Sequence, residues 1–236
     1  MADLIESARA ILSSSERRME ATANNVANIT TPGFKSERLY SDVSAGADVR
    51  APETLLKQRV DFAQGRLNKT GNPLDLAISG AGFFRLAASD GSIAYTRSGQ
   101  FKVADSGRVV NAQGLALQTA DGGDLVVPNG HIQILADGTV LDGDRPIAKV
   151  GVYQVAAGGQ MQPIGGSLFG APDGAMEDVA QPNVRQGMLE TSNVTLATEM
   201  ITMMDALRQA EGGARLVQTY DDLMGKAVST LGQGTR

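Results

Sequence analysis

The sequence predicts a mixed α and β protein with segregated parts: long N- and C-terminal helices that pack as a coiled-coil-like pair, and a central antiparallel all-β domain. Two observations predict this fold class. Apolar residues recur at every seventh position near both ends of the 236-residue chain, which is the pattern of a helix with one apolar seam. Of the 28 glycines, 20 fall within residues 65–174, where Asn-Gly, Asp-Gly and Ser-Gly pairs separate runs of strand length.

Residues 1–35 are expected to form the first helix and the turn that ends it. An apolar row and a second row of mostly small residues share one helix face: Ile5, Leu12, Met19 and Val26 in the first row, and Ala8, Ser15, Thr22 and Ile29 in the second. The small row would allow another helix to come close. Asn28 and then Thr31-Pro32-Gly33 stop the helix, because Pro and Gly at the second and third turn positions suit a type II turn.

The middle of the chain is expected to hold the β domain between two connectors. Residues 36–64, with mixed charge, Gly46 and Pro52, are interpreted as the first connector. Turn pairs spaced by about 8 to 12 residues indicate an antiparallel sandwich or barrel over residues 65–175. Residues 176–192 are the return connector.

Residues 193–236 are expected to form the longer helix, beginning near Val194 with Ser192-Asn193 as its N-cap. Gly212-Gly213 lies inside this helix and predicts a bend or close packing. Two seam rows share one face: Leu196, Met203, Ala210, Val217, Met224 and Leu231 in the first, and Met200, Leu207, Ala214, Asp221 and Val228 in the second.

The two helices would be rods of roughly 40 to 50 Å, too long for the β domain to cover. We therefore expect them to pair with each other, and the seam positions left over to pack against other subunits. The asparagines at the end of the first helix would cap it or fix the register between helices. The residues expected to take part in self-assembly are Ile5, Leu12, Met19, Val26, Asn24, Asn25, Asn28, Leu196, Met200, Met203, Leu207, Val217, Met224 and Leu231.

Composition argues against several classes of function. The chain has no cysteine and one histidine, which excludes thiol catalysis, thiolate zinc sites and multi-histidine metal sites. A net charge of −5 without a basic stripe argues against nucleic-acid binding. No stretch supplies the roughly 18 to 20 apolar residues of a membrane helix, and the N-terminus lacks the features of a cleaved signal peptide.

No catalytic, cofactor-binding or metal-binding residue is expected, and no enzyme activity. His131 is interpreted as an ordinary residue at a strand end. Gly80-Ala81-Gly82 begins like a dinucleotide fingerprint, but no βαβ pattern surrounds it, so we interpret it as a glycine bend entering a strand. A hydrolase would need a carboxylate pair in one cleft, which the sequence alone does not reveal.

Four stretches of the sequence resemble the signature motifs of the flagellar rod, hook and hook-associated axial proteins. They occur in the same order as in that family and cover the chain nearly end to end. The stretches are residues 23–28 (ANNVAN) with 31–35 (TPGFK), residues 71–78 (GNPLDLAI) with 80–84 (GAGFF), residues 95–101 (YTRSGQF), and residues 186–194 (QGMLETSNV) leading to Glu199-Met200.

The resemblance implies a structural subunit of the basal-body rod, most similar to the proximal-rod subunit, with the distal-rod subunit as the alternative. Such a subunit is exported by the flagellar type III apparatus without cleavage, and it assembles helically with other rod subunits in the periplasm to form the drive shaft that transmits torque. A different class of function stays open from the residues alone, namely an adhesin-like β module that is oligomerised by its helical ends.

Overall fold

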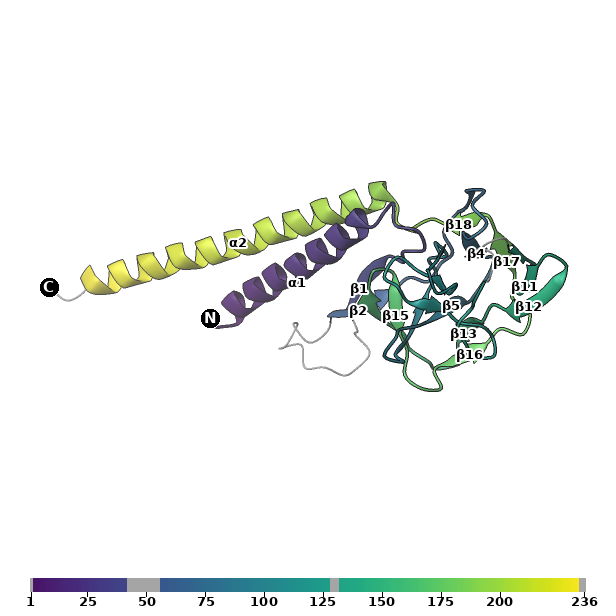
Figure 1. The fold of residues 1–236 in the computed structure, drawn as a ribbon. Helices are drawn as coiled ribbons and strands as arrows, with labels where there is room; N and C mark the ends of the chain where they lie inside the picture. The colour runs from purple at the N-terminus through teal and green to yellow at the C-terminus, as the bar shows by residue number, and fades with distance from the viewer. Residues whose placement is uncertain (1, 42–55, 128–131, 234–236) are drawn as a thin grey trace. The chain divides into compact units, whose positions relative to one another are not determined.

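The computed structural model describes residues 2–41, 56–127 and 132–233 (Figure 1). His131, Gly46 and Pro52 lie outside these described residues. The chain divides into two compact units, each made of stretches that are separate in the sequence. The helical unit comprises Met1–Ala27, Glu37–Asp61 and Val194–Arg236, and the β unit comprises Asn28–Ser36 and Phe62–Asn193.

The helical unit contains the two long helices and one small β ladder. Helix α1 spans Ala2–Ala27 and helix α2 spans Leu196–Gln233. Strand β1 (Glu37–Ser41) pairs antiparallel with β2 (Leu56–Val60), so the range interpreted as the first connector contributes strands to this unit. The prediction of a helix at each end is confirmed, and α2 begins two residues after the predicted start, within the usual variation of helix boundaries.

The predicted turn after α1 is present at the start of the β unit. The backbone N–H of Phe34 donates a hydrogen bond to the Thr31 carbonyl oxygen over 3.3 Å. Between them Gly33 has a φ of 68°, a left-handed conformation that glycine adopts without a steric penalty at the third position of a type II turn.

The two helices run antiparallel, since the amide of Asn25 near the end of α1 meets Glu199 near the start of α2. The contact is made by small residues: Ala8, Ser15 and Thr22 of α1 are each at most 2% exposed, and Ala206 of α2 is 1% exposed. The small row therefore lies at the contact, as its predicted role requires.

The β unit is antiparallel throughout its described strands, which confirms the predicted class. Its largest sheet has nine strands, and a three-stranded and two two-stranded ladders complete the unit. The nine-stranded sheet has the order β14 (Gln162–Gly165), β15 (Leu168–Gly170), β6 (Ile93–Thr96), β5 (Phe83–Ala87), β9 (Ala116–Leu117), β8 (Val109–Val110) and β7 (Lys102–Val103), with β13 (Val152–Val155) pairing both β5 and β16 (Met176–Asp178).

One of the smaller ladders joins consecutive strands, and the other two join segments that are far apart in the sequence. They are β10 (Gln133–Ile134) with β11 (Thr139–Asp142) and β12 (Arg145–Lys149), β17 (Val184–Gln186) with β4 (Leu76–Ile78), and β18 (Met188–Glu190) with β3 (Leu67–Lys69). The last two pairs bring the segment that precedes α2 back beside the first strands of the β unit. Residues 184–190 are therefore part of the β unit rather than a free linker.

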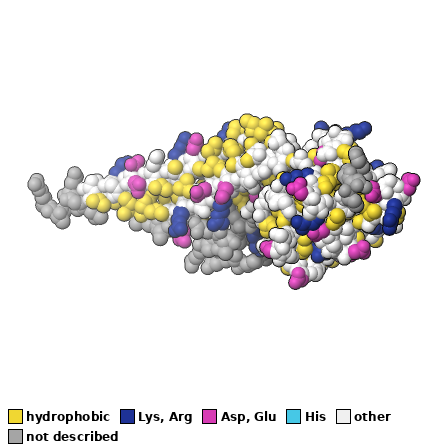
Figure 2. All heavy atoms as spheres, in the orientation of Figure 1, with side chains coloured by type: hydrophobic (Ala, Val, Ile, Leu, Met, Phe, Trp, Pro, Cys, Tyr) yellow, Lys and Arg dark blue, Asp and Glu magenta, His cyan; other side chains and the backbone are white. Residues whose placement is uncertain are grey.

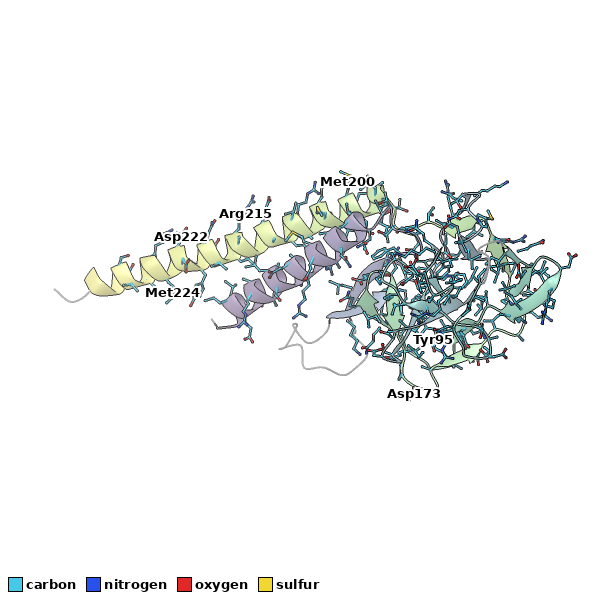
Figure 3. All side chains as sticks on the ribbon, viewed as in Figure 1. Tyr95, Asp173, Met200, Arg215, Asp222 and Met224 are labelled. Atoms are coloured by element: carbon cyan, nitrogen blue, oxygen red, sulfur yellow. The ribbon has the colours of Figure 1, made fainter. Side chains whose placement is uncertain are left out.

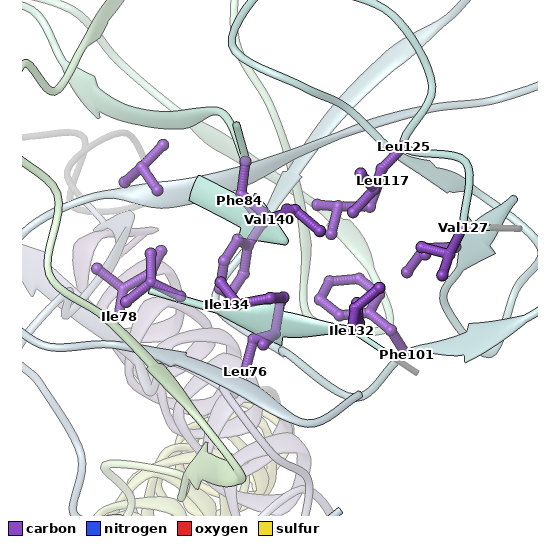
Figure 4. Packing of buried hydrophobic residues seen from close by; sticks show 14 of the residues in the cluster. Leu76, Ile78, Phe84, Phe101, Leu117, Leu125, Val127, Ile132, Ile134 and Val140 are labelled. Carbon is purple, nitrogen blue, oxygen red and sulfur yellow. The ribbon is translucent and has the colours of Figure 1, made fainter. Parts of the chain in front are cut away.

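The core of the β unit is mostly aliphatic, as the low aromatic content predicts (Figure 4). Phe84 and Phe101 form an edge-to-face pair at its centre, with ring centroids 5.6 Å apart, a geometry that aromatic rings favour. The aliphatic side chains around them include Leu76, Ile78, Leu117, Leu125, Val127, Ile132, Ile134 and Val140. The bend at Gly80-Ala81-Gly82 leads directly into β5, as predicted.

Candidate functional site

The helix pair carries large apolar side chains that its own chain does not cover. Figure 2 shows hydrophobic side chains gathered along both helices. Four of them lie at intervals of four, four and three residues on α2 and therefore share one side of the helix. We call this set the outer stripe: Leu196, Met200, Met204 and Leu207, which are 47%, 56%, 50% and 48% exposed.

The outer stripe points away from the contact with α1. Met200 projects from the side of α2 opposite α1 (Figure 3), whereas Ala206 and Gly213 face α1 and are buried. The residues of the seam rows predicted on this helix therefore differ in exposure. Met203, Ala210 and Val217 are half-buried, while Met200 and Leu207 remain uncovered.

The residues predicted for self-assembly fall into three groups of exposure. The exposed ones are Ile5, Asn24, Leu196, Met200, Leu207 and Met224. The half-buried ones are Leu12, Met19, Val26, Asn28, Met203 and Val217. Asn25 is buried, at 1% exposure, and the side chain of Leu231 lies outside the described residues. Their contacts with other subunits stay a prediction.

Gly213 sets how closely the two helices approach. A Cβ atom at this position would lie 3.2 Å from side-chain carbons of both Ile11 and Leu12, whereas a Cβ at Gly212 would meet nothing within 4 Å. Two carbons so close are tighter than ordinary van der Waals contact. The prediction of close packing at this glycine pair is confirmed, and Gly213 is the member that makes it.

Asn25 joins three elements of the helical unit through its side-chain amide. Its Nδ2 donates to the Glu37 carbonyl over 2.9 Å and to Glu199 Oε2 over 3.2 Å, and its Oδ1 accepts from the Glu37 N–H over 2.8 Å. The amide thus pairs with the first residue of β1 as a neighbouring strand would, while it also bonds α2. Because all these groups are part-buried or buried, the contact fixes the register of α1 against both elements.

Replacing Asn25 by alanine is expected to destabilise the helical unit by about 1–3 kcal/mol, because the Glu37 N–H and the Glu199 carboxylate would lose a buried partner. The matched control is Asn24→Ala, at the neighbouring exposed position. Urea unfolding followed by helical circular dichroism compares the two. Equal unfolding midpoints for both variants would contradict the assigned role of Asn25.

A buried ionic cluster lies in the β unit, and sequence reasoning missed it. Lys35 Nζ is 2.6 Å from Glu190 Oε1, with both side chains 0% exposed, and Arg97 Nε is 3.2 Å from Glu190 Oε2. We call these three residues the ionic cluster. Burial lowers the pKa of the Arg97 guanidinium, and the negative charge of Glu190 opposes that shift.

Backbone groups complete the ionic cluster. Lys35 Nζ donates to the Ala63 carbonyl over 2.7 Å, and Glu190 Oε1 accepts from the Gly65 N–H over 2.9 Å. The two terminal nitrogens of Arg97 donate to the carbonyls at both glycines of the bend before β5, each over 2.6 Å. Three stretches of chain that enter or leave the β unit are held together at this point, because buried charges persist only when they are paired and hydrogen-bonded.

The three members of the ionic cluster come from three of the four motifs noted in the sequence, and the fourth motif supplies backbone partners. Lys35 ends TPGFK, Arg97 is the third residue of YTRSGQF, and Glu190 lies in QGMLETSNV, while the carbonyls that Arg97 binds belong to GAGFF. The motifs therefore fix the fold of the β unit. The signal that could have found the cluster is one charged residue inside each of three otherwise polar or apolar motifs.

In the described part of the β unit, one hollow has a single charged side chain in its lining. This hollow of about 530 Å³ is lined by Phe62, Phe83 and Val155, and its charged member, Arg97, is already committed to Glu190. Across the described ranges, no three His, Cys, Asp or Glu side chains gather as a metal site would need. Among the helices that the structure describes, none combines the length and apolar content to cross a membrane.

Comparison with known proteins shows that most of the chain is similar to flagellar proteins. Three family profiles match it in order along the sequence. They are described as flagella basal body rod protein (residues 8–35), flagellar hook protein FlgE/F/G D1 domain (residues 77–141), and flagellar basal body rod FlgEFG protein C-terminal (residues 185–230).

Curated relatives span nearly the full length of the chain. The flagellar basal-body rod protein FlgF of Caulobacter vibrioides is 30% identical over 92% of this chain and 93% of its own length. FlgF of Salmonella typhimurium is 31% identical, covering 89% of this chain and 90% of the relative. FlgG of Borreliella burgdorferi is 29% identical, covering 92% and 94%.

Proposed function

Because the chain belongs to the family of flagellar basal-body rod proteins, we propose that it builds the rod by packing its terminal helices against those of neighbouring rod subunits. The assembly is helical and includes other members of the family. The subunit reaches the periplasm through the flagellar export apparatus without a cleaved signal peptide, and it has no enzyme activity. Torque passes through the packed helices of the finished rod.

The observation that carries this proposal is the outer stripe. Its four large side chains are each about half exposed in a single chain. Full burial of such a side chain is worth about 1.5–3 kcal/mol, so covering the exposed half contributes about 1 kcal/mol for each of the four. A stripe of this kind on one helix favours assembly through that helix.

The rigidity that a drive shaft needs is supported by one tight contact inside each unit. In the helical unit, the small row and Gly213 let the helices pack closely. In the β unit, the ionic cluster joins three stretches of chain. Closely packed interiors have low compressibility and transmit strain.

The alignments favour the proximal-rod subunit, FlgF, over the distal-rod subunit, FlgG. Alignments with three FlgF relatives span 224 to 229 positions, fewer than the 236 residues of this chain. Alignments with five FlgG relatives span 247 to 260 positions, so the FlgG chains carry insertions that this chain lacks. The proposed identity is therefore an F-type rod subunit.

The test places a charge on the outer stripe. Leu207→Asp is expected to abolish swimming in a strain that lacks its own copy, because the buried carboxylate would have no partner in the assembled rod. Gln209→Asp, an exposed position of the same helix off the stripe, is the control and should preserve swimming. Both purified variants should keep the circular dichroism of the parent. Normal swimming by the Leu207→Asp strain would overturn the proposal.

A further inference from the structure

Helix α2 continues beyond the N-terminal end of α1. Gly213 lies opposite Ile11 and Leu12, and in an antiparallel pair each further residue of α2 meets an earlier residue of α1. Since α1 begins at Ala2, the residues of α2 after about 222 have no counterpart in their own chain. Met224 lies in this overhang (Figure 3).

The overhang continues the face of α2 that packs on α1. Met203, Ala210 and Val217 recur every seven residues and are half-buried, and Met224 is the next residue of that row but is 39% exposed. Val228, four residues on, is 67% exposed. The same kind of surface that is covered along α1 is thus left uncovered once α1 ends.

Three side chains toward the end of α2, two of them in the overhang, repeat the spacing of the outer stripe. Tyr220, Met224 and Val228 stand at intervals of four residues, as Leu196, Met200 and Met204 do, and the shift between the two sets is 24 residues. We call the first set the tail stripe. Tyr220 is half-buried, and the other two are exposed. At 1.5 Å per residue the shift corresponds to about 36 Å along the helix.

We propose that the tail stripe of one copy docks on the outer stripe of a second copy, with the two α2 helices parallel and displaced by 24 residues. This inference rests on the proposed function and names the contact that the assembly uses. Two different surfaces of the same chain meet in it, so the interface is heterologous. A heterologous contact that does not close on itself extends as an open helical array.

The charges beside the two stripes permit this register. With a displacement of 24 residues, Asp221, Asp222 and Lys226 fall opposite Ala197, Thr198 and Thr202. None of these three charged side chains is set against one of like sign, which would cost several kcal/mol at an interface. Side chains of matching length also face each other, with Met224 opposite Met200.

The absence of cysteine from the chain allows a direct test by disulfide formation. We expect the double variant Met200→Cys, Met224→Cys to form a ladder of dimers, trimers and longer products in basal bodies from swimming cells treated with a thiol oxidant. The two positions lie about 36 Å apart on one helix, so a bond between them within one chain is geometrically impossible. Each bond must therefore join two copies.

Two controls make the result specific. Each single-cysteine variant should remain monomeric, because the proposed contact never places a position against itself. The double variant Met200→Cys, Arg215→Cys should also stay monomeric, since Arg215 projects from α2 elsewhere along the helix (Figure 3). Swimming cells without a ladder would overturn the inference and leave the proposed function standing. Dimers of Met200→Cys alone, or an equal ladder from the control, would also overturn it.

Discussion

Replacing Glu190 by alanine is expected to destabilise the β unit by about 3–5 kcal/mol, because the change leaves Lys35 and Arg97 buried without their shared counter-charge. Lys35 has no route to water, since its side chain is 0% exposed. Arg97 retains its two backbone carbonyls but loses the carboxylate that offsets its desolvation. Urea unfolding followed by near-ultraviolet circular dichroism of the tyrosines in the β unit measures the effect.

The control for Glu190→Ala is an exposed ion pair in the same unit. Arg108 lies 3.2 Å from Asp124, with side chains 44% and 34% exposed, and pairs of this kind contribute about 0–1 kcal/mol. Arg108→Ala should therefore shift the unfolding midpoint little. If Glu190→Ala lowered the free energy of unfolding no more than Arg108→Ala does, the ionic cluster would not be holding the β unit together.

Gly213→Leu is expected to separate the helix pair at its middle and to destabilise the helical unit by about 1–3 kcal/mol, the usual penalty for overpacking. The added side chain would meet Ile11 and Leu12 at the position where a Cβ alone already lies 3.2 Å from them. A Cβ atom one residue earlier, at Gly212, would meet no atom within 4 Å, so Gly212→Leu should be tolerated. It should gain up to about 1 kcal/mol from the higher helix propensity of leucine.

Thermal unfolding followed by helical circular dichroism distinguishes the two glycine variants. We expect a lower melting temperature for Gly213→Leu than for the parent protein, and an equal or higher melting temperature for Gly212→Leu. Swimming should fail only in the strain that carries Gly213→Leu, since the rod needs the closely packed pair. Melting temperatures that move together would contradict close packing at Gly213.

The sequence predicts the parts of the fold that depend on residues close together along the chain. The seven-residue rows predict both helices, and Pro32-Gly33 predicts the turn after the first one. The rows also identify one apolar face, and the small row of the first helix predicts where another helix comes close. The structure places the small row of α1 at the contact, because close approach of two backbones favours small residues there over long ones.

The ionic cluster could not be predicted from the sequence, because its members are far apart along the chain. Lys35 and Glu190 are separated by 155 positions. The pairing of β17 with β4 and of β18 with β3 brings Glu190 near Lys35. A seven-residue repeat or a turn motif describes only residues that are close together in the sequence. The burial of a charge depends on the complete topology, which such signals do not specify.

For the β unit, the sequence likewise predicts an antiparallel class of fold but not which strands pair. Asp-Gly and Ser-Gly pairs mark turns, and they predict antiparallel neighbours. They do not reveal that β13 pairs with both β5 and β16, since β5 precedes β13 by about seventy residues. Pairings between distant strands are set by which apolar faces can be buried together.

In the assembled rod, neighbouring copies should cover the outer stripe. Oxidation of methionine by hydrogen peroxide, quantified by mass spectrometry, reads this directly, because Met200 and Met204 are 56% and 50% exposed in the single chain and exposed methionine is the more readily oxidised. We expect rapid oxidation of both methionines in the isolated protein and strong protection of both in purified rods. Equal oxidation rates in the isolated protein and in rods would contradict it.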